Sequence, residues 1–452
     1  MTDAMPRLDL KLTDYIPDSP LARMSYVATE GMWAPDAEGR LQLVPFQFAP
    51  WEKEELSWYD GCYIHAGLNP FIVYRVIGRD FPQLLTDVSV NTFRQFPVGK
   101  ARHTILCNNA GKLLMDGIVV RRTEDEFLVF CLPDPAGMNA QMGNRYDIQV
   151  ENLYGRHFFY QLCGPTSLQV VERAAQKDLH DLRFMWSCPA TIAGHEVMVL
   201  RTSMAGTLGY EVHGAVEDAA EVYESLVSAG DGLGIQPLGR HAYRNAHTEG
   251  SIPQMMMHFA PAPPDDARVS GELPVEFSGS LDPSTGLIFR SPIDCGWEGM
   301  IRWDHDFPGK EALAAELAGP HRTAVTLVWN VDDCLEAIRG AFDAEDPVDT
   351  MDMVEDFNPM KTSLDIHTDA VYVGDELVGC SNSRMLSAKT RQMISLGTID
   401  TRFAHQGDEV EVLWGNPGTR QVRIRATVDV FPFIKEGRNE DFDTETIPHP
   451  VF

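Results

Sequence analysis

The pattern of apolar and polar residues changes near residue 320 of the chain. Before this point, short apolar runs are rich in Val, Ile, Leu and Phe, as strands are. They span residues 71–77, 104–107, 118–120 and 127–131. Segments with helical spacing lie between and after these runs, so this part of the chain is predicted to have an α+β fold.

Two segments of this part of the chain are predicted to be helices. In residues 218–229 one face is apolar and consists of Ala219, Val222, Tyr223 and Leu226. Gly230 follows this segment as a stop signal. A shorter helix is predicted over 310–318, because Gly319 and Pro320 come directly after it.

Beyond residue 320 the pattern is mostly that of strands, with one helical insert near 333–342. Apolar and polar residues alternate through 422–430, which predicts a strand with one buried face. We therefore expect an N-terminal arm over 1–50, a central region over 51–320 and a β-rich domain over 321–452. The acidic tail 436–445 is predicted to be solvated.

Charge excludes two classes of partner. Acidic residues outnumber basic ones by 66 to 37, which gives a net charge of −29. Such a surface repels nucleic acid and anionic lipid. No apolar run reaches the about 18 residues of a membrane helix, and the first residues lack the apolar core of a signal peptide. These features predict a cytoplasmic protein.

General catalytic motifs are missing from the sequence. It has no Walker loop, no H-E-x-x-H and no G-x-S-x-G, and its 8 cysteines form no C-x-x-C pair. We expect the cysteines to be reduced and buried. Asp304-His305-Asp306 is interpreted as a polar turn, so no metal site is predicted.

Three short stretches in the central region resemble one known family. They are Asn109 to Val120, which contains Asp116; Ala205 to Val212, which contains Glu211; and Gly239 to Arg244, which begins with Arg240. These stretches resemble the aminomethyltransferase family, the T-protein of glycine cleavage and its demethylase relatives. Met115 stands where the family has a first aspartate, and Thr207 where it has a first glutamate.

Later stretches continue the resemblance in the same order, so that it covers residues 65–434. They are Cys295 to Trp297, Asp306 to Leu313, Val378 to Ser383 and Val430 to Phe433. Within the family, the segments 302–307, 328–333, 394–400 and 412–415 look most like the tetrahydrofolate-dependent aromatic O-demethylases. The segment 65–70 does not match the histidine-rich segment of the vanillate enzymes. The resemblance implies two folate-binding subdomains followed by a C-terminal β-barrel.

The implied reaction moves a one-carbon group from a methoxy- or methylenedioxy-aromatic compound to N5 of tetrahydrofolate. By family position, Asp116 would orient the folate nitrogens and manage a proton, and Gly117 would leave room for a ring. Glu211 would accept hydrogen bonds from the pterin. Arg240 would meet a folate carboxylate or pterin oxygen, and Trp297 would stack near the folate ring.

Tyr243 stands where the aromatic O-demethylases place a tyrosine. A phenol whose pKa is near 10 is a matched proton donor for a leaving phenolate. Arg121 and Arg122 are candidates for a substrate carboxylate, although pairing with Glu124 or Asp125 across their hairpin turn is an equal alternative.

Other functions of the same fold stay open. They are an N- or S-demethylase, a non-catalytic folate-binding regulator, and a T-protein that acts on a lipoyl carrier. The transferred carbon can be methyl or methylene, and no oligomeric state is predicted. Because the folate tail is anionic, a chain with a charge of −29 needs a local positive patch at the site. The candidates are Arg240, Arg244, Arg121 and Arg122.

Overall fold

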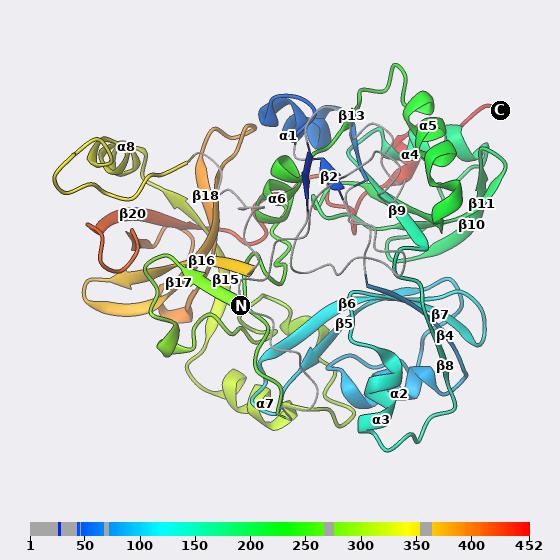
Figure 1. Ribbon diagram of the computed structural model, residues 1–452, viewed down its shortest axis with the longest axis horizontal. Coiled ribbons are helices and arrows are strands. Elements are labelled where there is room, and N and C mark those ends of the chain that lie inside the picture. Colours follow the sequence, from blue (N-terminus) through cyan, green and yellow to red (C-terminus); the bar gives the residue numbers. More distant parts are fainter. Residues whose placement is uncertain (1–25, 29–42, 46, 67–71, 266–274, 353–363) are drawn as a thin grey trace, which may run out of the picture.

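The computed structural model describes residues 26–28, 43–45, 47–66, 72–265, 275–352 and 364–452. The predicted arm 1–50 lies mostly outside these residues, and within it β1 (Tyr26–Ala28) pairs with β2 (Leu43–Pro45). The other described residues form mainly three larger β-sheets and the helices that pack on them (Figure 1). In the described ranges, no helix is both long and apolar enough to cross a membrane.

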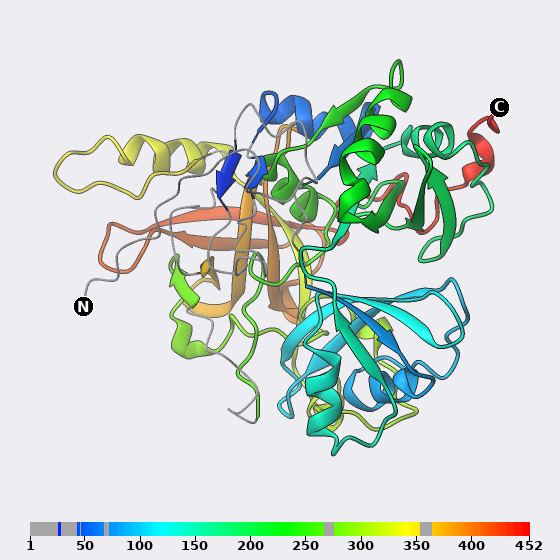
Figure 2. The same ribbon diagram turned by 45° about the vertical axis from the view of Figure 1, so that its right-hand side comes forward.

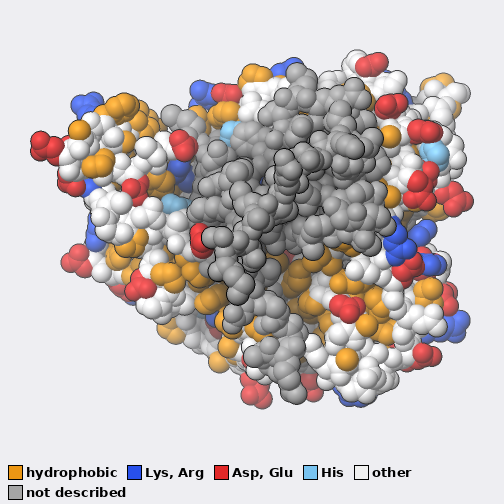
Figure 3. Space-filling view, in the orientation of Figure 1, with side chains coloured by type: hydrophobic (Ala, Val, Ile, Leu, Met, Phe, Trp, Pro, Cys, Tyr) orange, Lys and Arg blue, Asp and Glu red, His pale blue; other side chains and the backbone are white. Residues whose placement is uncertain are grey.

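The first large sheet is five-stranded and antiparallel. Its order is β5 (Ala101–Cys107), β6 (Leu113–Arg121), β7 (Glu126–Phe130), β4 (Val73–Ile77) and β8 (Gln149–Asn152). It contains all four predicted early strands, although Ile72 and Cys131 lie just beyond the ends of β4 and β7 and residue 71 lies outside the described residues. The apolar face of α2 (Phe81–Val88) packs on this sheet, and α3 (Pro135–Gln141) follows β7. In Figure 3, hydrophobic side chains gather at the lower right, over this sheet.

The second large sheet has six strands. Its order is β10 (Ser187–Ile192), β11 (His195–Arg201), β12 (Gly209–Ala215), β9 (His157–Cys163), β3 (Cys62–His65) and β13 (Ile235–Pro237). Helices α4 (Ser167–Ala175) and α5 (Ala219–Ala229) pack on it. The helix predicted over 218–229 is confirmed as α5, and the predicted apolar face is buried. Tyr160 of β9 fixes this helix by donating a hydrogen bond to the carbonyl of Ala219 at 2.6 Å.

The third sheet closes into a barrel. Its strands are β16 (Leu364–Val373), β17 (Glu376–Leu386), β18 (Met393–Asp400), β15 (Arg322–Trp329), β20 (Val422–Asp429) and β19 (Glu409–Trp414), and β19 pairs back with β16. Along β20, buried and exposed side chains alternate, as its sequence predicts. The predicted helices 310–318 and 333–342 are present as α7 (Lys310–Ala318) and α8 (Val331–Gly340). The α+β fold with a C-terminal barrel is thus confirmed.

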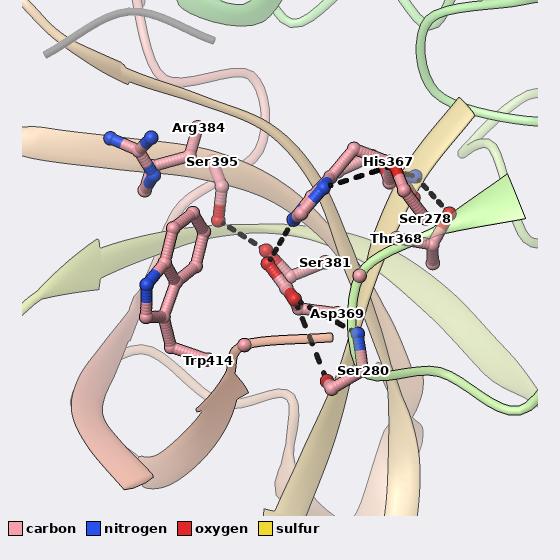
Figure 4. Close-up of polar contacts among 12 residues, drawn as sticks. Ser278, Ser280, His367, Thr368, Asp369, Ser381, Arg384, Ser395 and Trp414 are labelled. Atoms are coloured by element: carbon pink, nitrogen blue, oxygen red, sulfur yellow. Dashed lines mark hydrogen bonds and ion pairs between the residues drawn. The ribbon is translucent and has the colours of Figure 1, made fainter. Parts of the chain in front are cut away.

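A buried aspartate joins the barrel to the chain that precedes it. Strand β14 (Val275–Ser278) runs parallel to β16, and Ser280 just after it donates its backbone N–H to Asp369 Oδ1 at 3.3 Å. The other oxygen of Asp369 lies 3.1 Å from His367 Nε2 (Figure 4). Because Asp369 is only 2% exposed, these donors supply the partners that a buried carboxylate requires.

The chain returns from β20 to the six-stranded sheet, as the red segment of Figures 1 and 2 shows. Arg201 of β11 is 5% exposed and donates to Asn439 Oδ1 at 3.0 Å and to the carbonyl of Phe442 at 2.9 Å. His180 donates from Nε2 to the carbonyl of Ile447 at 3.0 Å. The acidic residues of the tail 436–445 are exposed, as predicted, whereas Asn439 and Thr444 of the same segment are buried.

Candidate active site

A cavity of about 1270 Å³ lies between the five-stranded and six-stranded sheets, which face each other in Figure 2. Helix α6 (Arg240–Glu249), the segments 251–256 and 296–302, and residues 438–440 of the C-terminal segment complete its wall. Much of the wall is apolar. It is also easily reshaped, because it contains several methionine side chains, which are unbranched and flexible. The methionines in the wall are Met115, Met185, Met204, Met255, Met256 and Met300.

Asp116 lies on β6, with its carboxylate in the wall of this cavity. On the neighbouring strand, His103 has its Nε2 2.8 Å from Asp116 Oδ2. The indole of Trp297 packs edge-on against the His103 ring, with the ring centroids 4.9 Å apart. The structure thus brings the predicted residues Asp116 and Trp297 to the cavity. It joins them through His103, which was not among the site residues predicted from the sequence.

Gly117 lines the cavity, and the structure gives a second reason for glycine at this position. A Cβ atom at this position would lie 2.1 Å from the carbonyl oxygen of Phe130 on the adjacent strand. Gly117 is needed for the close approach of β6 and β7, and the space that its missing side chain leaves is filled by backbone.

Glu211 lies on β12 and reaches the cavity from the opposite sheet. It is 4% exposed, and each carboxylate oxygen has one partner. Gln161 donates to Oε1 at 3.2 Å, and His213 Nε2 lies 3.1 Å from Oε2. Gln161 is positioned in turn by the hydroxyl of Tyr63. A carboxylate has about four lone-pair sites, so Glu211 can accept further hydrogen bonds from a ligand.

Tyr243 projects from α6 into the same cavity. Its ring is stacked on His65, with the centroids 4.2 Å apart. Among the residues that the structure describes, nothing hydrogen-bonds its hydroxyl. Burial and the negative charge of Glu211 raise the pKa of Tyr243 well above 10. The phenol therefore stays protonated near neutral pH and is prepared to donate a hydrogen bond to a ligand.

His247 is a cavity residue to which the sequence analysis assigned no role. It follows Tyr243 by one helical turn, and the two rings meet edge to face. Its Nδ1 lies 3.2 Å from the carbonyl of Ile252, so this nitrogen must carry the proton. Its Nε2 then offers a lone pair, is buried and has no hydrogen-bond partner among the described residues. Burial lowers the pKa of His247 to about 4.

The predicted arginines lie outside this wall. Arg121 donates to Glu124 Oε2 at 2.9 Å, and Arg122 donates to Glu126 Oε1 at 3.3 Å, so both engage in pairing at their hairpin. Arg240 is the first residue of α6. Burial and the nearby charge of Arg244 lower its pKa to about 10. Neither Arg240 nor Arg244 is part of the described cavity wall.

Other cations line the cavity instead. They are Arg94, Lys100, Arg102, Arg302 and Arg438. Two of them are neutralised, because Arg94 pairs with Asp304 at 3.1 Å and Arg438 pairs with Glu440. The expected positive patch is therefore present at the cavity, but it is formed by residues that the sequence analysis did not select.

The only cysteine in the described cavity wall is Cys131. Burial and the charges of Asp116 and Glu211 raise its pKa well above the usual 9. It is therefore a neutral thiol, which is a poor nucleophile.

Comparisons with known proteins agree with this architecture. The model of the GCVT N-terminal domain matches residues 65–260. The chain is 38% identical to a sesamin methylene transferase from a Sinomonas species, over 90% of this chain and 94% of that protein. It is 28% identical to a syringate O-demethylase from a Sphingobium species, over 86% of this chain and 90% of that protein.

The fold is also similar to a solved structure. The glycine cleavage system aminomethyltransferase T from Bartonella henselae superimposes with a TM-score of 0.63 and 17% sequence identity. The match covers 91% of this chain and 95% of the other chain. At 17% sequence identity, the similarity shows that the two proteins share a fold.

The protonation of His247 provides a direct test of the site geometry. Because its pKa is lowered to about 4, His247 should stay neutral at pH 5.5, where exposed histidines are protonated. Nitrogen-15 NMR of the imidazoles should show Nδ1 as the protonated nitrogen, with the signal assigned by its loss in His247→Gln. A signal that titrates near pH 6.5, or a proton on Nε2, would contradict the described geometry.

Proposed function

The chain belongs to the aminomethyltransferase family, and we propose that it transfers a one-carbon group from a methoxy- or methylenedioxy-aromatic compound to N5 of tetrahydrofolate. The observation that carries this proposal is the cavity wall itself. It holds two carboxylates from opposite sheets, Asp116 and Glu211, and a phenol with an unused donor, Tyr243. The names of the two similar transferases support an aromatic ether as the substrate class.

The polar groups of the wall fit a pterin. A pterin presents adjacent N–H donors, and a carboxylate can accept two such donors side by side. Glu211 is held in place by Gln161 and His213 and keeps unused lone pairs for this role. The unpartnered Nε2 of His247 offers a second acceptor in the same wall. A buried acceptor without a partner is costly, so a ligand donor at this atom would remove that cost.

The remainder of the cavity fits the other parts of the cofactor and a second ligand. Aromatic wall residues, among them Phe130, Phe159 and Trp297, suit flat rings. The cations that line the cavity suit the carboxylates of a glutamyl tail. The volume of about 1270 Å³ exceeds the about 300–1,000 Å³ typical of one small ligand, so a cofactor and an aromatic substrate can be held together.

When bound, tetrahydrofolate supplies the nitrogen nucleophile that accepts the one-carbon group. The protein contributes alignment of the three reacting atoms in a cavity with an apolar wall. Asp116 is a candidate to receive the proton that the nitrogen gives up. Its Oδ2 is held by His103, and its Oδ1 has no hydrogen-bond partner in the described part of the chain. The carboxylate is thereby fixed while one oxygen stays available.

Tyr243 is proposed to stabilise the departing aryl oxygen. A phenol with the ordinary pKa near 10 was predicted to act here as a proton donor, but the pKa of Tyr243 in the structure lies well above that value. Transfer of its proton to a phenolate of ordinary basicity is then unfavourable. Donation of a hydrogen bond to the developing negative charge is favourable and strongest in the transition state. Catalysis should therefore depend on the O–H group and not on its acidity.

The activity is tested with vanillate, syringate, guaiacol and sesamin as substrates, each with and without tetrahydrofolate. We expect at least one of these substrates to lose a methyl group, or to have its methylenedioxy ring opened, and so to yield a phenol. A one-carbon folate should form with it, and both products should appear only when tetrahydrofolate is present. Mass spectrometry identifies both products. Asp116→Asn should slow turnover about 100-fold or more, because it removes a proton acceptor. Equal turnover without folate would exclude the proposed reaction.

Substitution of Tyr243 separates hydrogen bonding from packing. Tyr243→Phe keeps the ring on His65 but removes the O–H group, so kcat should fall about 100-fold. The Kd of tetrahydrofolate, measured by calorimetry, should change less than about twofold. Tyr223→Phe removes a hydroxyl from the buried core under α5 and serves as the matched control, with unchanged kcat. An unchanged kcat in Tyr243→Phe would remove the residue from the mechanism.

A further inference from the structure

A cluster of histidine and acidic side chains joins the C-terminal segment after β20 to the end of α4. Asp178 and His180 follow α4, and His449 belongs to the C-terminal segment. Each of these three residues offers one possible metal-ligand atom, and the three atoms all lie within 4.8 Å of one another. None of the three residues is part of the cavity wall. Because Asp178 and His449 are 271 residues apart, their spacing in the sequence gives no sign of the cluster.

Both imidazole rings of the cluster are oriented by an acceptor at Nε2. His180 donates from Nε2 to the carbonyl of Ile447 at 3.0 Å. His449 donates from Nε2 to Glu445 Oε2 at 3.3 Å. In a neutral ring with its proton on Nε2, the Nδ1 atom is a bare lone pair. Both Nδ1 atoms face the carboxylate of Asp178, at 3.1 Å in His180 and at 2.7 Å in His449.

This arrangement requires a cation, because a lone pair and a carboxylate oxygen repel each other at hydrogen-bond distance. Glu172 of α4 adds to the requirement. It is only 1% exposed, its Oε1 lies 2.9 Å from His180 Nδ1, and its Oε2 is buried without a partner among the described residues. In the described part of the chain, no lysine or arginine pairs with Glu172, Asp178 or Glu445. The missing positive charge is therefore supplied by protons or by a metal ion.

We propose that Asp178, His180 and His449 bind a divalent transition-metal ion of the zinc type, with the buried carboxylate of Glu172 as a fourth ligand. Imidazole nitrogens together with carboxylate oxygens are ligands that Zn²⁺ prefers, and it takes four of them. A histidine that binds a metal usually donates its other N–H to a carbonyl or a carboxylate, which fixes the ring. Both histidines of the cluster already have this support.

A metal ion explains the cluster better than protons do. The two rings are stacked, with their centroids 3.9 Å apart. If each Nδ1 atom carried a proton, two positively charged rings would face each other and repel. One metal ion accepts both lone pairs while the rings stay neutral, and it also offers a partner to the unsatisfied oxygen of Glu172.

The ion would have a structural role, because its ligands come from two parts of the chain and lie outside the cavity wall. Glu172 lies on α4, which packs on the six-stranded sheet. The C-terminal segment supplies His449 and also supplies residues 438–440 to the cavity wall. Metal binding therefore fastens to the sheet a segment that forms part of the cavity.

The test is a zinc titration of the full chain without a histidine tag, after treatment with a chelator and transfer to chelator-free buffer near neutral pH. Calorimetry should show one ion per chain, with a Kd of about 1 μM or lower. Hydrogen exchange measures the structural role. At zinc concentrations about 100 times the Kd, the backbone amides of residues 444–449 should exchange up to about 100-fold more slowly, because bound metal opposes local opening.

Three variants separate a built site from unspecific binding to histidine. The side chain of His449 is 53% exposed, so His449→Ala should fold and should weaken zinc binding by more than about 100-fold. Glu445→Ala removes only the acceptor at His449 Nε2 and should weaken it about tenfold. His195→Ala is the matched control. His195 also contacts two carboxylates, Asp218 and Glu221, but through opposite ring nitrogens, so the three cannot share one ion. It should keep the wild-type Kd.

The absence of saturable zinc binding would overturn the inference. Zinc binding that survives unchanged in His449→Ala would also overturn it, because the ion would then lie elsewhere. Magnesium is the second probe, since it prefers oxygen ligands and should not compete with zinc. Magnesium that displaces zinc at equal concentration would show that the imidazoles are not ligands and would contradict the proposed site.

Discussion

The placement of two carboxylates, the buried Glu211 and the half-buried Asp116, in the wall of a largely apolar cavity is the constraint on which the rest of the site depends. A carboxylate removed from water needs hydrogen-bond partners, or it becomes protonated. Asp116 has His103 beside it, and Glu211 has Gln161 and His213. These partners come from the same or neighbouring strands as the carboxylates, so each sheet supplies one carboxylate already fixed in position. The facing of the two sheets then places both groups around one ligand volume.

Helix α6 adds groups of a different kind to the two fixed carboxylates. Tyr243 offers a donor and His247 an acceptor, and neither group is satisfied by the described protein. Such groups are costly in a folded chain, and they are retained at sites where a ligand completes them. The C-terminal segment closes this side of the cavity. Its own position depends on the buried Arg201, so the wall is built from parts of the chain far apart in sequence.

Local sequence signals predicted many of the helices and strands, and short motifs predicted several of the site residues. The bounds of α7, the buried face of α5 and the alternation of β20 follow from periodicity and from Gly and Pro stop signals. Short motifs selected four site residues that all lie at the cavity: Asp116, Glu211, Tyr243 and Trp297.

The directions in which the basic side chains point were not predictable from local motifs. Arg121 and Arg122 turn to nearby glutamates, and Lys100 and Arg102 carry no motif. The tail 436–445 is ordered by Arg201, more than 200 residues away.

The central claim is that carbon leaves an aromatic ether and becomes bonded to the nitrogen of tetrahydrofolate in this cavity. The most direct measurement follows that carbon with a carbon-13 label in the methoxy or methylenedioxy group of an accepted substrate. In a single turnover with excess enzyme and tetrahydrofolate, NMR should show the labelled carbon coupled to a nitrogen of the folate. Label recovered as free formaldehyde or methanol, with unchanged tetrahydrofolate, would contradict the account.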